Sequence, residues 1–318
     1  MPLMPRYRNA LPQDEDNAMM LTDGGLETTL IYRDGIDLPH FAACELLRTE
    51  NGMRRLLDYY SENALVAVKA GIAFSIDSPT WRANPDWTDK LGYTSAEFDE
   101  INRAGIHLAE EVRRRHENDA SPMVIAGLIG PRGDGYRVGD KRTPEEAAAY
   151  HSRQIALFAD TEADYIAALT LSYSEEAIGI ARASHDLGMP VVISFTVELD
   201  GRLASGESLG NAIETVDSAT RAYPEYYMVN CAHPDHLPDE LFDEEAAWPM
   251  RVRGIRANAS RKSHEELDES TELDDGDPDE LGREFSELRD RLPHLTVVGG
   301  CCGTDVRHIE AIAHAVAR

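Results

Sequence analysis

Positive charge is scarce in this sequence. The 318 residues include 31 lysine and arginine side chains against 58 aspartate and glutamate side chains, which gives a formal net charge of −27. Only four of the basic residues are lysines. A surface of this sign repels phosphate groups, so we expect neither nucleic acid nor an anionic membrane as a partner. Such a surface is typical of a cytoplasm rich in salt, where screening is strong; the alternative is an ordinary soluble acidic protein.

Long apolar runs are also missing. No run approaches the ~20 residues that a membrane-spanning helix needs. Residues 1–17 are polar and contain acidic side chains, unlike a signal peptide, and we expect an N-terminal extension there. Four cysteines in a chain of this length do not make a disulfide framework. These absences favour a soluble protein of the reducing cytoplasm.

Short apolar runs alternate with longer amphipathic stretches along the chain. The runs predict buried strands at residues 19–23, 73–78, 123–129, 165–170, 191–197, 226–231, 252–257 and 295–299. The stretches predict helices at residues 51–70, 96–116, 144–159, 174–187, 208–221, 236–246, 278–291 and 305–317. This α/β pattern predicts a (β/α)8 TIM barrel, with a doubly wound open sheet as the main alternative. We expect a single domain over residues 1–318, in which the acid-rich residues 264–280 form a solvated loop.

Three cysteines carry the most specific chemistry. Cys301 and Cys302 are adjacent and follow two glycines at a predicted strand end. Adjacent thiols rarely pair with each other because the ring is strained, and glycines let the backbone turn so that both sulfurs face one point. Cys231 ends the sixth predicted strand, and the ends of strands six and eight open on the same rim of a barrel. We therefore predict a Zn²⁺ site at these three cysteines; the alternative is three buried, inert thiols.

Three thiolates leave one position of a tetrahedral zinc ion open, as catalytic zinc sites do. The remaining cysteine, Cys44, lies in a mostly apolar stretch, where we expect it to pack. A thiol bound to Zn²⁺ loses its proton near neutral pH, and the thiolate is a good nucleophile for methyl transfer. The sequence therefore predicts a catalytic metal centre.

These motifs resemble the zinc signature of the homocysteine S-methyltransferase family. The resemblance covers most of the chain and rests on Gly299-Gly300-Cys301-Cys302-Gly303-Thr304 with His308, Val229-Asn230-Cys231, and residues 22–28, 126–133 and 194–206. It implies a TIM barrel, Zn²⁺ as the cofactor, a small-molecule thiol acceptor and a small-molecule methyl donor. It also implies transfer to the zinc-bound sulfur of homocysteine, which gives methionine.

The resemblance implies further contacts around the metal. Asp23, Gly24 and Gly25 lie where the family contacts the amino acid substrate. A carboxylate suits an ammonium group and glycines permit a close approach of backbone, whereas a turn with a cap is the alternative. Asn258 lies where related sequences have an asparagine near the metal, so we expect it at the open position or in a turn. Asn230 is expected to orient the ligand loop.

One position departs from the family pattern. At the end of the fourth strand the family usually has a glutamate that binds the amino group of the substrate, and this sequence has Leu169. Because leucine cannot pair with an ammonium ion, the acceptor is open between homocysteine and a related thiol or selenol. Three aromatic residues are expected at the mouth of the pocket, where they suit a cationic donor, or in wall packing: Trp81, Trp87 and Tyr173.

Three functions are compatible with such a metal site. The first is a zinc-dependent thiol methyltransferase; the chain is too short for an additional cobalamin domain, which implies direct transfer or a separate partner. The second is a zinc hydrolase or lyase, but three thiolates make a bound water less acidic, which argues against it. The third is a non-enzymatic zinc-binding or regulatory barrel. A deep open pocket over the metal would count against this third hypothesis.

Overall fold

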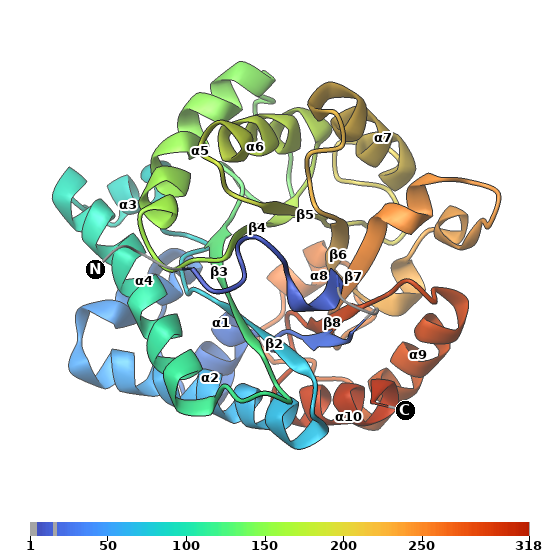
Figure 1. Ribbon diagram of the computed structural model, residues 1–318, viewed down its shortest axis with the longest axis horizontal. Helices are drawn as coiled ribbons and strands as arrows, with labels where there is room; N and C mark the ends of the chain where they lie inside the picture. The colour runs from blue at the N-terminus through green and yellow to red at the C-terminus, as the bar shows by residue number, and fades with distance from the viewer. Residues whose placement is uncertain (1–4, 15–17, 318) are drawn as a thin grey trace.

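Eight parallel strands close into a barrel in the computed structural model, which describes residues 5–14 and 18–317 (Figure 1). The order around the barrel is the order in the sequence, and β1 pairs with both β2 and β8. The predicted TIM barrel is therefore confirmed, because an open sheet would leave two edges unpaired. The strands are β1 (Met20–Leu21), β2 (Ala73–Asp77), β3 (Met123–Ile129), β4 (Tyr165–Leu171), β5 (Val191–Phe195), β6 (Tyr227–Ala232), β7 (Val252–Ala257) and β8 (Val297–Gly300).

Helices form a ring around the strands (Figure 1). Seven of the eight predicted helices are present, each within one residue of its predicted ends, because Thr, Ser or Asp caps begin most of them. In the described part of the chain no helix is long and apolar enough to cross a membrane. The helices are α1 (Leu26–Thr28), α2 (Glu50–Ala70), α3 (Pro85–Lys90), α4 (Ser95–His116), α5 (Pro144–Ala159), α6 (Ser174–Asp186), α7 (Leu209–Thr220), α8 (His264–Asp268), α9 (Pro278–Arg291) and α10 (Val306–Val316).

The helix predicted at residues 236–246 is wrong. Pro238 lacks a backbone N–H and restricts the residue before it, so an α-helix cannot run through this position. Beyond it, Asp239 and Asp243 would repel each other one helical turn apart. The segment instead contains the short 3-10 turn Asp239–Phe242; the turn Pro234–His236 ends at its first residue, and the turn Trp248–Arg251 follows it.

Side chains of the strands alternate between two apolar cores. In β4, Tyr165, Ala167 and Leu169 belong to a cluster inside the barrel, whereas Ile166 and Ala168 belong to the larger cluster between strands and helices. This alternation is the period of two that any strand imposes. Leu169 therefore faces the barrel interior, at the level where the strands end.

Two strands are irregular at their carboxyl ends. The pairing register shifts near the end of β4 and again near the end of β6. Thr170 and Cys231 lie in these shifts with backbone φ angles of 65° and 55°. A left-handed backbone costs a non-glycine residue about 1–3 kcal/mol, and such costs are tolerated where they re-aim a functional side chain.

The opposite end of the barrel is closed by residues 5–14, the described part of the predicted N-terminal extension. The guanidinium group of Arg8 donates to three backbone carbonyl groups of the α5–β4 connection, and the backbone N–H of Tyr7 donates to Asp164 at 2.7 Å. Leu11 and Gln13 are buried. This segment therefore packs as part of the barrel floor.

Candidate metal centre and active site

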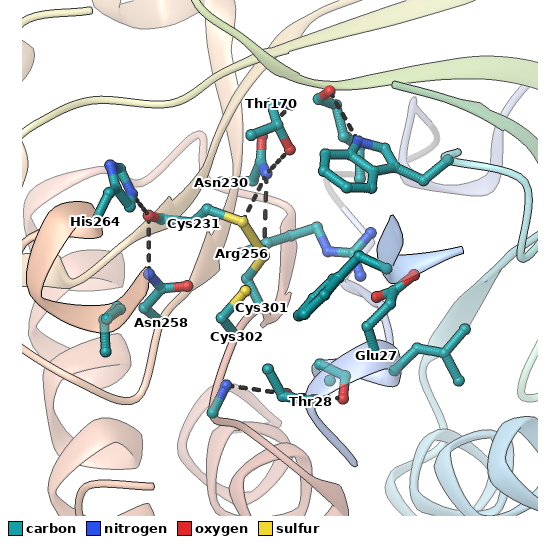
Figure 2. A pocket seen from close by; sticks show the side chains of 18 of the residues that line it. Glu27, Thr28, Thr170, Asn230, Cys231, Arg256, Asn258, His264, Cys301 and Cys302 are labelled. Carbon is teal, nitrogen blue, oxygen red and sulfur yellow. Dashed lines mark hydrogen bonds between the residues drawn. A yellow bond between two sulfur atoms is a disulfide. The ribbon is translucent and has the colours of Figure 1, made fainter. Parts of the chain in front are cut away.

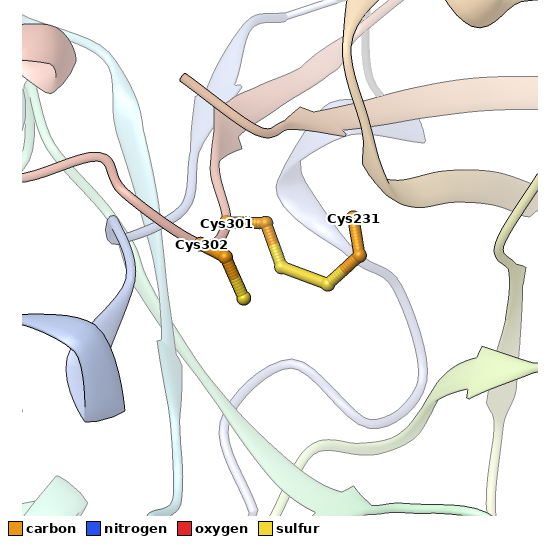
Figure 3. A group of neighbouring side chains, drawn as sticks. All are labelled: Cys231, Cys301 and Cys302. Atoms are coloured by element: carbon orange, nitrogen blue, oxygen red, sulfur yellow. A yellow bond between two sulfur atoms is a disulfide. The ribbon is translucent and has the colours of Figure 1, made fainter. Parts of the chain in front are cut away.

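The three predicted zinc ligands meet at the rim of the barrel (Figure 3). Cys231 lies at the end of β6, and Cys301 and Cys302 follow directly after β8. Their sulfur atoms all lie within 4.8 Å of one another. The barrel therefore joins residues that are 70 positions apart in the sequence. Their role as metal ligands stays a prediction.

Cys231 and Cys301 are joined by a disulfide, with 5.3 Å between their Cα atoms, and Cys302 is a free thiol (Figure 3). A metal ion binds thiolates, so both cysteines must be reduced before the three sulfurs can act as one ligand set. The predicted binding of a metal at this site therefore depends on reduction of the disulfide.

Asn230 fixes the orientation of Cys231 (Figure 2). Its side-chain oxygen accepts hydrogen bonds from the backbone N–H of Thr170 at 2.9 Å and from the hydroxyl of Ser194 at 2.7 Å. Its side-chain nitrogen donates to the hydroxyl of Thr170 at 2.9 Å and to the sulfur of Cys231 at 3.2 Å. Contacts with β4 and β5 therefore fix the side-chain amide of Asn230, and its N–H group points at the sulfur of Cys231. This arrangement agrees with the expectation that Asn230 orients the loop of Cys231.

Asn258 and His264 hold the backbone of the same cysteine. The side-chain nitrogen of Asn258 donates to the carbonyl oxygen of Cys231 at 2.9 Å, and Nε2 of His264 donates to it at 2.6 Å. The side-chain oxygen of Asn258 is buried without a hydrogen-bond partner, and it lies on the side of the cysteine sulfurs (Figure 2). An unsatisfied buried acceptor beside three sulfurs fits a zinc ion, which accepts sulfur and oxygen ligands.

The free thiols are poor acids as long as no cation is beside them. Burial raises the pKa of Cys302 to about 11, and the negative charge of Glu27 adds to this effect. Burial likewise raises the pKa of Cys44 to about 12, and the negative charge of Glu45 adds to it. Cys44 is fully buried in the apolar core, as expected for packing. A thiolate at Cys302 therefore requires a positive ion close to its sulfur.

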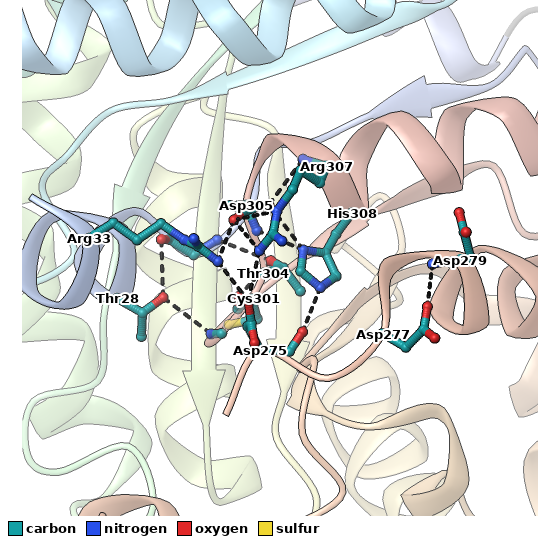
Figure 4. A network of polar contacts seen from close by, with 12 residues as sticks. Thr28, Arg33, Asp275, Asp277, Asp279, Cys301, Thr304, Asp305, Arg307 and His308 are labelled. Carbon is teal, nitrogen blue, oxygen red and sulfur yellow. Dashed lines mark hydrogen bonds and ion pairs between the residues drawn. The ribbon is translucent and has the colours of Figure 1, made fainter. Parts of the chain in front are cut away.

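The turn that carries Cys301 and Cys302 is held against the loop after β1. The backbone N–H of Gly25 donates to the carbonyl oxygen of Thr304 at 3.0 Å, and the N–H of Gly303 donates to the hydroxyl of Thr28 at 3.1 Å (Figure 4). A Cβ atom on Gly25 would lie 2.6 Å from the carbonyl oxygen of Cys301. Gly24 and Gly25 thus permit a close approach of backbone to the turn of Cys301 and Cys302; a substrate contact stays a prediction.

A charged network supports this turn from outside (Figure 4). Asp305 caps α10 by accepting from the backbone N–H of Arg307 at 3.0 Å, and it also pairs with the guanidinium groups of Arg33 and Arg307 at 2.7 and 2.9 Å. Nε2 of His308 donates to the carbonyl oxygen of Asp275 at 2.8 Å. The acidic segment and the turn after β8 are therefore tied to the same helix.

Asp23 is buried in an ion-paired cluster. The guanidinium group of Arg256 donates to the carboxylates of both Asp23 and Asp77, and its Nε donates to the carbonyl oxygen of Gly300 at 3.3 Å. Our sequence reasoning missed Arg256, although an arginine within an apolar strand was a visible signal. The predicted contact between Asp23 and a substrate remains untested, and the structure shows that its carboxylate already has a cationic partner.

A pocket of about 320 Å³ opens over the three cysteines. Its wall includes Leu169 and Trp81, but neither Trp87 nor Tyr173. The lining is strongly acidic, with Asp23, Glu27, Asp77, Asp134, Asp268, Glu272 and Asp274 against Arg82 and Arg256. An open pocket over the cysteines counts against a purely structural metal site and favours a positively charged ligand.

Residues 264–280 are not a uniform solvated loop. The segment begins with α8 and ends in the first turn of α9. It contributes Leu267 from α8, and Ser270 and Leu273 from the connection between the helices, to the pocket wall. The ring of Tyr136, from the loop after β3, packs on the ring of His264 with 4.3 Å between their centroids. Two segments that are distant in sequence therefore lie together over the turn of Cys301 and Cys302.

A second cluster of metal-ligand types lies outside this pocket. His233, Asp235 and Glu284 place one nitrogen and two oxygen atoms within 4.8 Å of one another. Arg261 donates to Asp235 at 2.6 Å and also contacts Glu284. A guanidinium group therefore already supplies the positive charge, and this cluster is a surface ion-pair network.

Comparison with known proteins provides independent information. The family model of homocysteine S-methyltransferase matches residues 20–316. Homocysteine S-methyltransferase 4 of Zea mays is 26% identical, with 95% of this chain and 90% of the relative covered. The selenocysteine Se-methyltransferase of Brassica oleracea var. italica is 24% identical, with 94% and 89% covered. The structures of the oxidized and metallated forms of the homocysteine methyltransferase MmuM from Escherichia coli each match with a TM-score of 0.73 and 18% identity. Each match covers 95% of this chain and 97% of the MmuM chain. At this level of identity the similarity shows the fold alone.

The family match extends from the first residue of β1 to the last residue of α10. It confirms the predicted family and the predicted enzyme class, and it favours the methyltransferase hypothesis over a zinc hydrolase or lyase and over a non-enzymatic zinc-binding barrel. The chain belongs to the homocysteine S-methyltransferase family, a family of thiol methyltransferases.

Proposed function

We propose that this protein transfers a methyl group from a small-molecule donor to a thiol bound at a zinc ion held by Cys231, Cys301 and Cys302. Homocysteine is the proposed acceptor and methionine the product. The observation that carries the proposal is the meeting of three sulfur atoms within 4.8 Å at the base of an open pocket. The unpartnered oxygen of Asn258 at the same place supports an additional, weakly held ligand position.

The residues of the chain have distinct proposed roles. When bound, Zn²⁺ would lower the pKa of an acceptor thiol, so that the nucleophile is present as a thiolate near neutral pH. The three cysteines hold the metal, and Asn230 donates to the sulfur of Cys231 and so fixes its direction. Residues 264–280 and Tyr136 cover the site and limit the access of water. A reducing, cytoplasmic setting is part of the proposal, because all three sulfurs must be thiolates.

The charge of the pocket supports a cationic methyl donor. Three of the seven acidic side chains that line it pair with Arg256 or Lys262, and the remaining four outnumber Arg82. An onium sulfur or nitrogen compound is therefore attracted, and a folate with its carboxylate tail is repelled. Trp81 adds an aromatic face to the same wall. We therefore expect transfer from a sulfonium or a quaternary ammonium compound directly to the thiolate.

The proposal is tested with reduced protein loaded with one equivalent of zinc. Homocysteine and selenocysteine are each incubated with S-methylmethionine, glycine betaine or 5-methyltetrahydrofolate, and methylated products are identified by mass spectrometry. We expect methionine from homocysteine with at least one of the two cationic donors, and no product after a chelator has removed the metal.

The matched control is Cys44→Ala, which removes a cysteine from the core and none from the pocket. This variant is expected to bind one zinc ion and to keep its activity. Zinc binding without methylation of either acceptor by any of the three donors would contradict the proposed function.

A further inference from the structure

The pocket wall at β4 offers no partner for an ammonium group. Leu169 is 5% exposed and packs in the cluster inside the barrel, with Leu128 and Trp81 against that cluster. The indole N–H of Trp81 donates to the carbonyl oxygen of Leu169 at 3.4 Å, which closes this wall. An α-amino acid bound at the metal would place its positive charge against hydrocarbon here, at a high cost.

Most carboxylates elsewhere in the pocket already have partners. Asp23 and Asp77 share the guanidinium group of Arg256. Asp274 accepts a hydrogen bond from the hydroxyl of Ser260 at 2.8 Å and pairs with Lys262 at 3.3 Å. These groups are neutralised locally, so they do not replace the missing carboxylate of β4.

Glu27, like Asp134 and Glu272, lines the pocket without a salt bridge among the described residues, and it directly precedes Thr28, which accepts a hydrogen bond from the turn of Cys301 and Cys302. Among the described residues no basic nitrogen lies within 4.0 Å of its carboxylate; Arg256 and Arg82 act on it only from a greater distance. Figure 2 shows the Glu27 side chain among the residues that line the pocket, together with the three cysteines. Desolvation in the pocket wall raises the pKa of this partly exposed carboxyl group, and Arg256 and Arg82 oppose the shift.

The backbone under Glu27 is fixed next to the metal-binding turn. Its neighbour Thr28 accepts the hydrogen bond from Gly303, and Gly25 donates to Thr304. Glu27 and Cys302 also line the same pocket. A ligand whose sulfur lies beside Cys302 therefore has Glu27 within reach of groups a few bonds away from that sulfur.

We propose that Glu27 is a specificity-determining residue that binds the α-ammonium group of an amino acid thiol, in place of the carboxylate that is absent at Leu169. This inference rests on the proposed function. The ammonium group forms a charge-assisted hydrogen bond with the Glu27 carboxylate, while the thiol sulfur is at the metal. The carboxylate has moved from the end of β4 to the loop after β1, on another wall of the same pocket.

The test compares two thiols that differ only in the amino group. Homocysteine and 4-mercaptobutanoate have the same length, thiol and carboxylate, and the second has hydrogen in place of the ammonium group. Binding to reduced, zinc-loaded protein is measured by calorimetry without a donor, and kcat and KM are measured with the donor that supports turnover. We expect the wild type to bind homocysteine about 10- to 100-fold more tightly than 4-mercaptobutanoate, the range for a hydrogen bond to a charged group.

Glu27→Gln should remove this preference. The affinity for homocysteine is expected to fall about 10- to 100-fold, through KM rather than kcat, while the affinity for 4-mercaptobutanoate changes less than about threefold. Glu272→Gln is the matched control, because it removes the same charge from the exposed rim of the pocket. It should leave the ratio between the two thiols unchanged.

Four outcomes would overturn the role of Glu27. They are an unchanged preference in Glu27→Gln, an equal loss for both thiols, a rise only in the KM of the methyl donor, and a loss of zinc from the variant. An equal affinity of the wild type for the two thiols would also overturn it, even if both were methylated and the proposed function stood. Tight binding of homocysteine without methylation by any donor would instead contradict the proposed function and leave the role of Glu27 intact.

Discussion

Asp164 and Asn258 lie at opposite ends of the barrel and differ in how their buried side-chain oxygens are paired. At the amino ends of the strands, Asp164 is fully buried, and its carboxylate accepts from Tyr7, Ile125 and Arg113 at 2.7, 2.8 and 3.0 Å. At the carboxyl ends, Asn258 has an unpartnered oxygen and Glu27 has no salt bridge among the described residues.

Within the strands, left-handed backbone at non-glycine residues occurs at Thr170 and Cys231. Thr170 and Cys231, with their left-handed backbones, both lie at the carboxyl ends of strands. Polar groups that are satisfied within the chain contribute to stability, whereas groups left unsatisfied at the rim await a ligand. We infer that stability and function are separated along the barrel axis. Mutations at the amino ends of the strands should therefore lower stability, and mutations at the carboxyl ends should lower zinc binding and activity.

The largest effect is expected from Cys302→Ser. Loss of one of three thiolates should reduce zinc content from one ion per chain to nearly none and lower kcat/KM by about 10³-fold or more, because metal affinity depends on every ligand. Zinc is measured by atomic emission after dialysis, and the melting temperature of the metal-free protein should stay within a few degrees of the wild type. A variant that kept both zinc and activity would show that Cys302 is not a ligand of the metal.

Asp164→Ala should produce the reverse pattern at the other end. It leaves Arg113 with one fewer partner and two backbone N–H groups unpaired, so we expect a loss of about 3–5 kcal/mol and a melting temperature about 5–15 °C lower. Zinc content and the KM for the thiol, measured at 20 °C, should not change. Loss of zinc in this folded variant would break the proposed separation of the two ends.

Asn230→Ala tests the support behind Cys231. Removing the amide leaves the sulfur without its donor and the backbone N–H of Thr170 without its acceptor, so zinc affinity should fall about 10- to 100-fold. Competition with a chromophoric chelator measures this change. Asn63→Ala is the matched control, because Asn63 is a buried asparagine in α2 whose side chain donates only to Tyr59; it should lower the melting temperature and leave zinc affinity unaltered.

Asp305→Ala should have the smallest effect and a defined pH dependence. Burial tends to raise the pKa of the Asp305 carboxyl, but hydrogen bonds from His308 and Arg307 outweigh it and hold the pKa well below its usual value. A depressed folded-state pKa stabilises the protein above the unfolded pKa of about 4, and this stabilisation is lost as the pH falls below it. Removal of the cap should cost about 1–2 kcal/mol at pH 7.

The pH dependence is measured as the difference in melting temperature between metal-free wild type and Asp305→Ala. The difference should shrink between pH 5 and pH 2. Asp305→Asn, which keeps a capping oxygen without the charge, should show a smaller difference that varies less with pH. A difference that grew as the pH fell would contradict the role of the Asp305 charge.

Most of the fold followed from local sequence. Apolar runs and capped amphipathic stretches predicted the eight strands and seven helices, since burial and capping act over a few residues. The proximity of Cys231 to Cys301 and Cys302 could be predicted because a barrel places the ends of strands six and eight on one rim. The prediction of a helix at residues 236–246 was wrong because the composition of the segment suits a helix, whereas Pro238 and the repulsion between its acidic side chains prevent one.

The site was predictable only in part, because several of its contacts join distant residues. Arg256 pairs with Asp23 and Asp77, which are 233 and 179 positions away in the sequence. No local sequence pattern predicts such pairs. The position of residues 264–280 over the pocket depends on contacts with Tyr136 and α10. Glu27 follows two glycines in a recognised motif, but only the structure reveals that it lacks a salt bridge and lines the pocket.

The most direct test of the central claim is zinc K-edge X-ray absorption on reduced, zinc-loaded protein before and after addition of homocysteine. We predict three sulfur ligands and one lighter atom before addition, and four sulfur ligands after it. A coordination shell with fewer than three sulfurs, or one in which homocysteine changes nothing, would contradict the claim that three cysteines hold a metal with a place for the acceptor thiol.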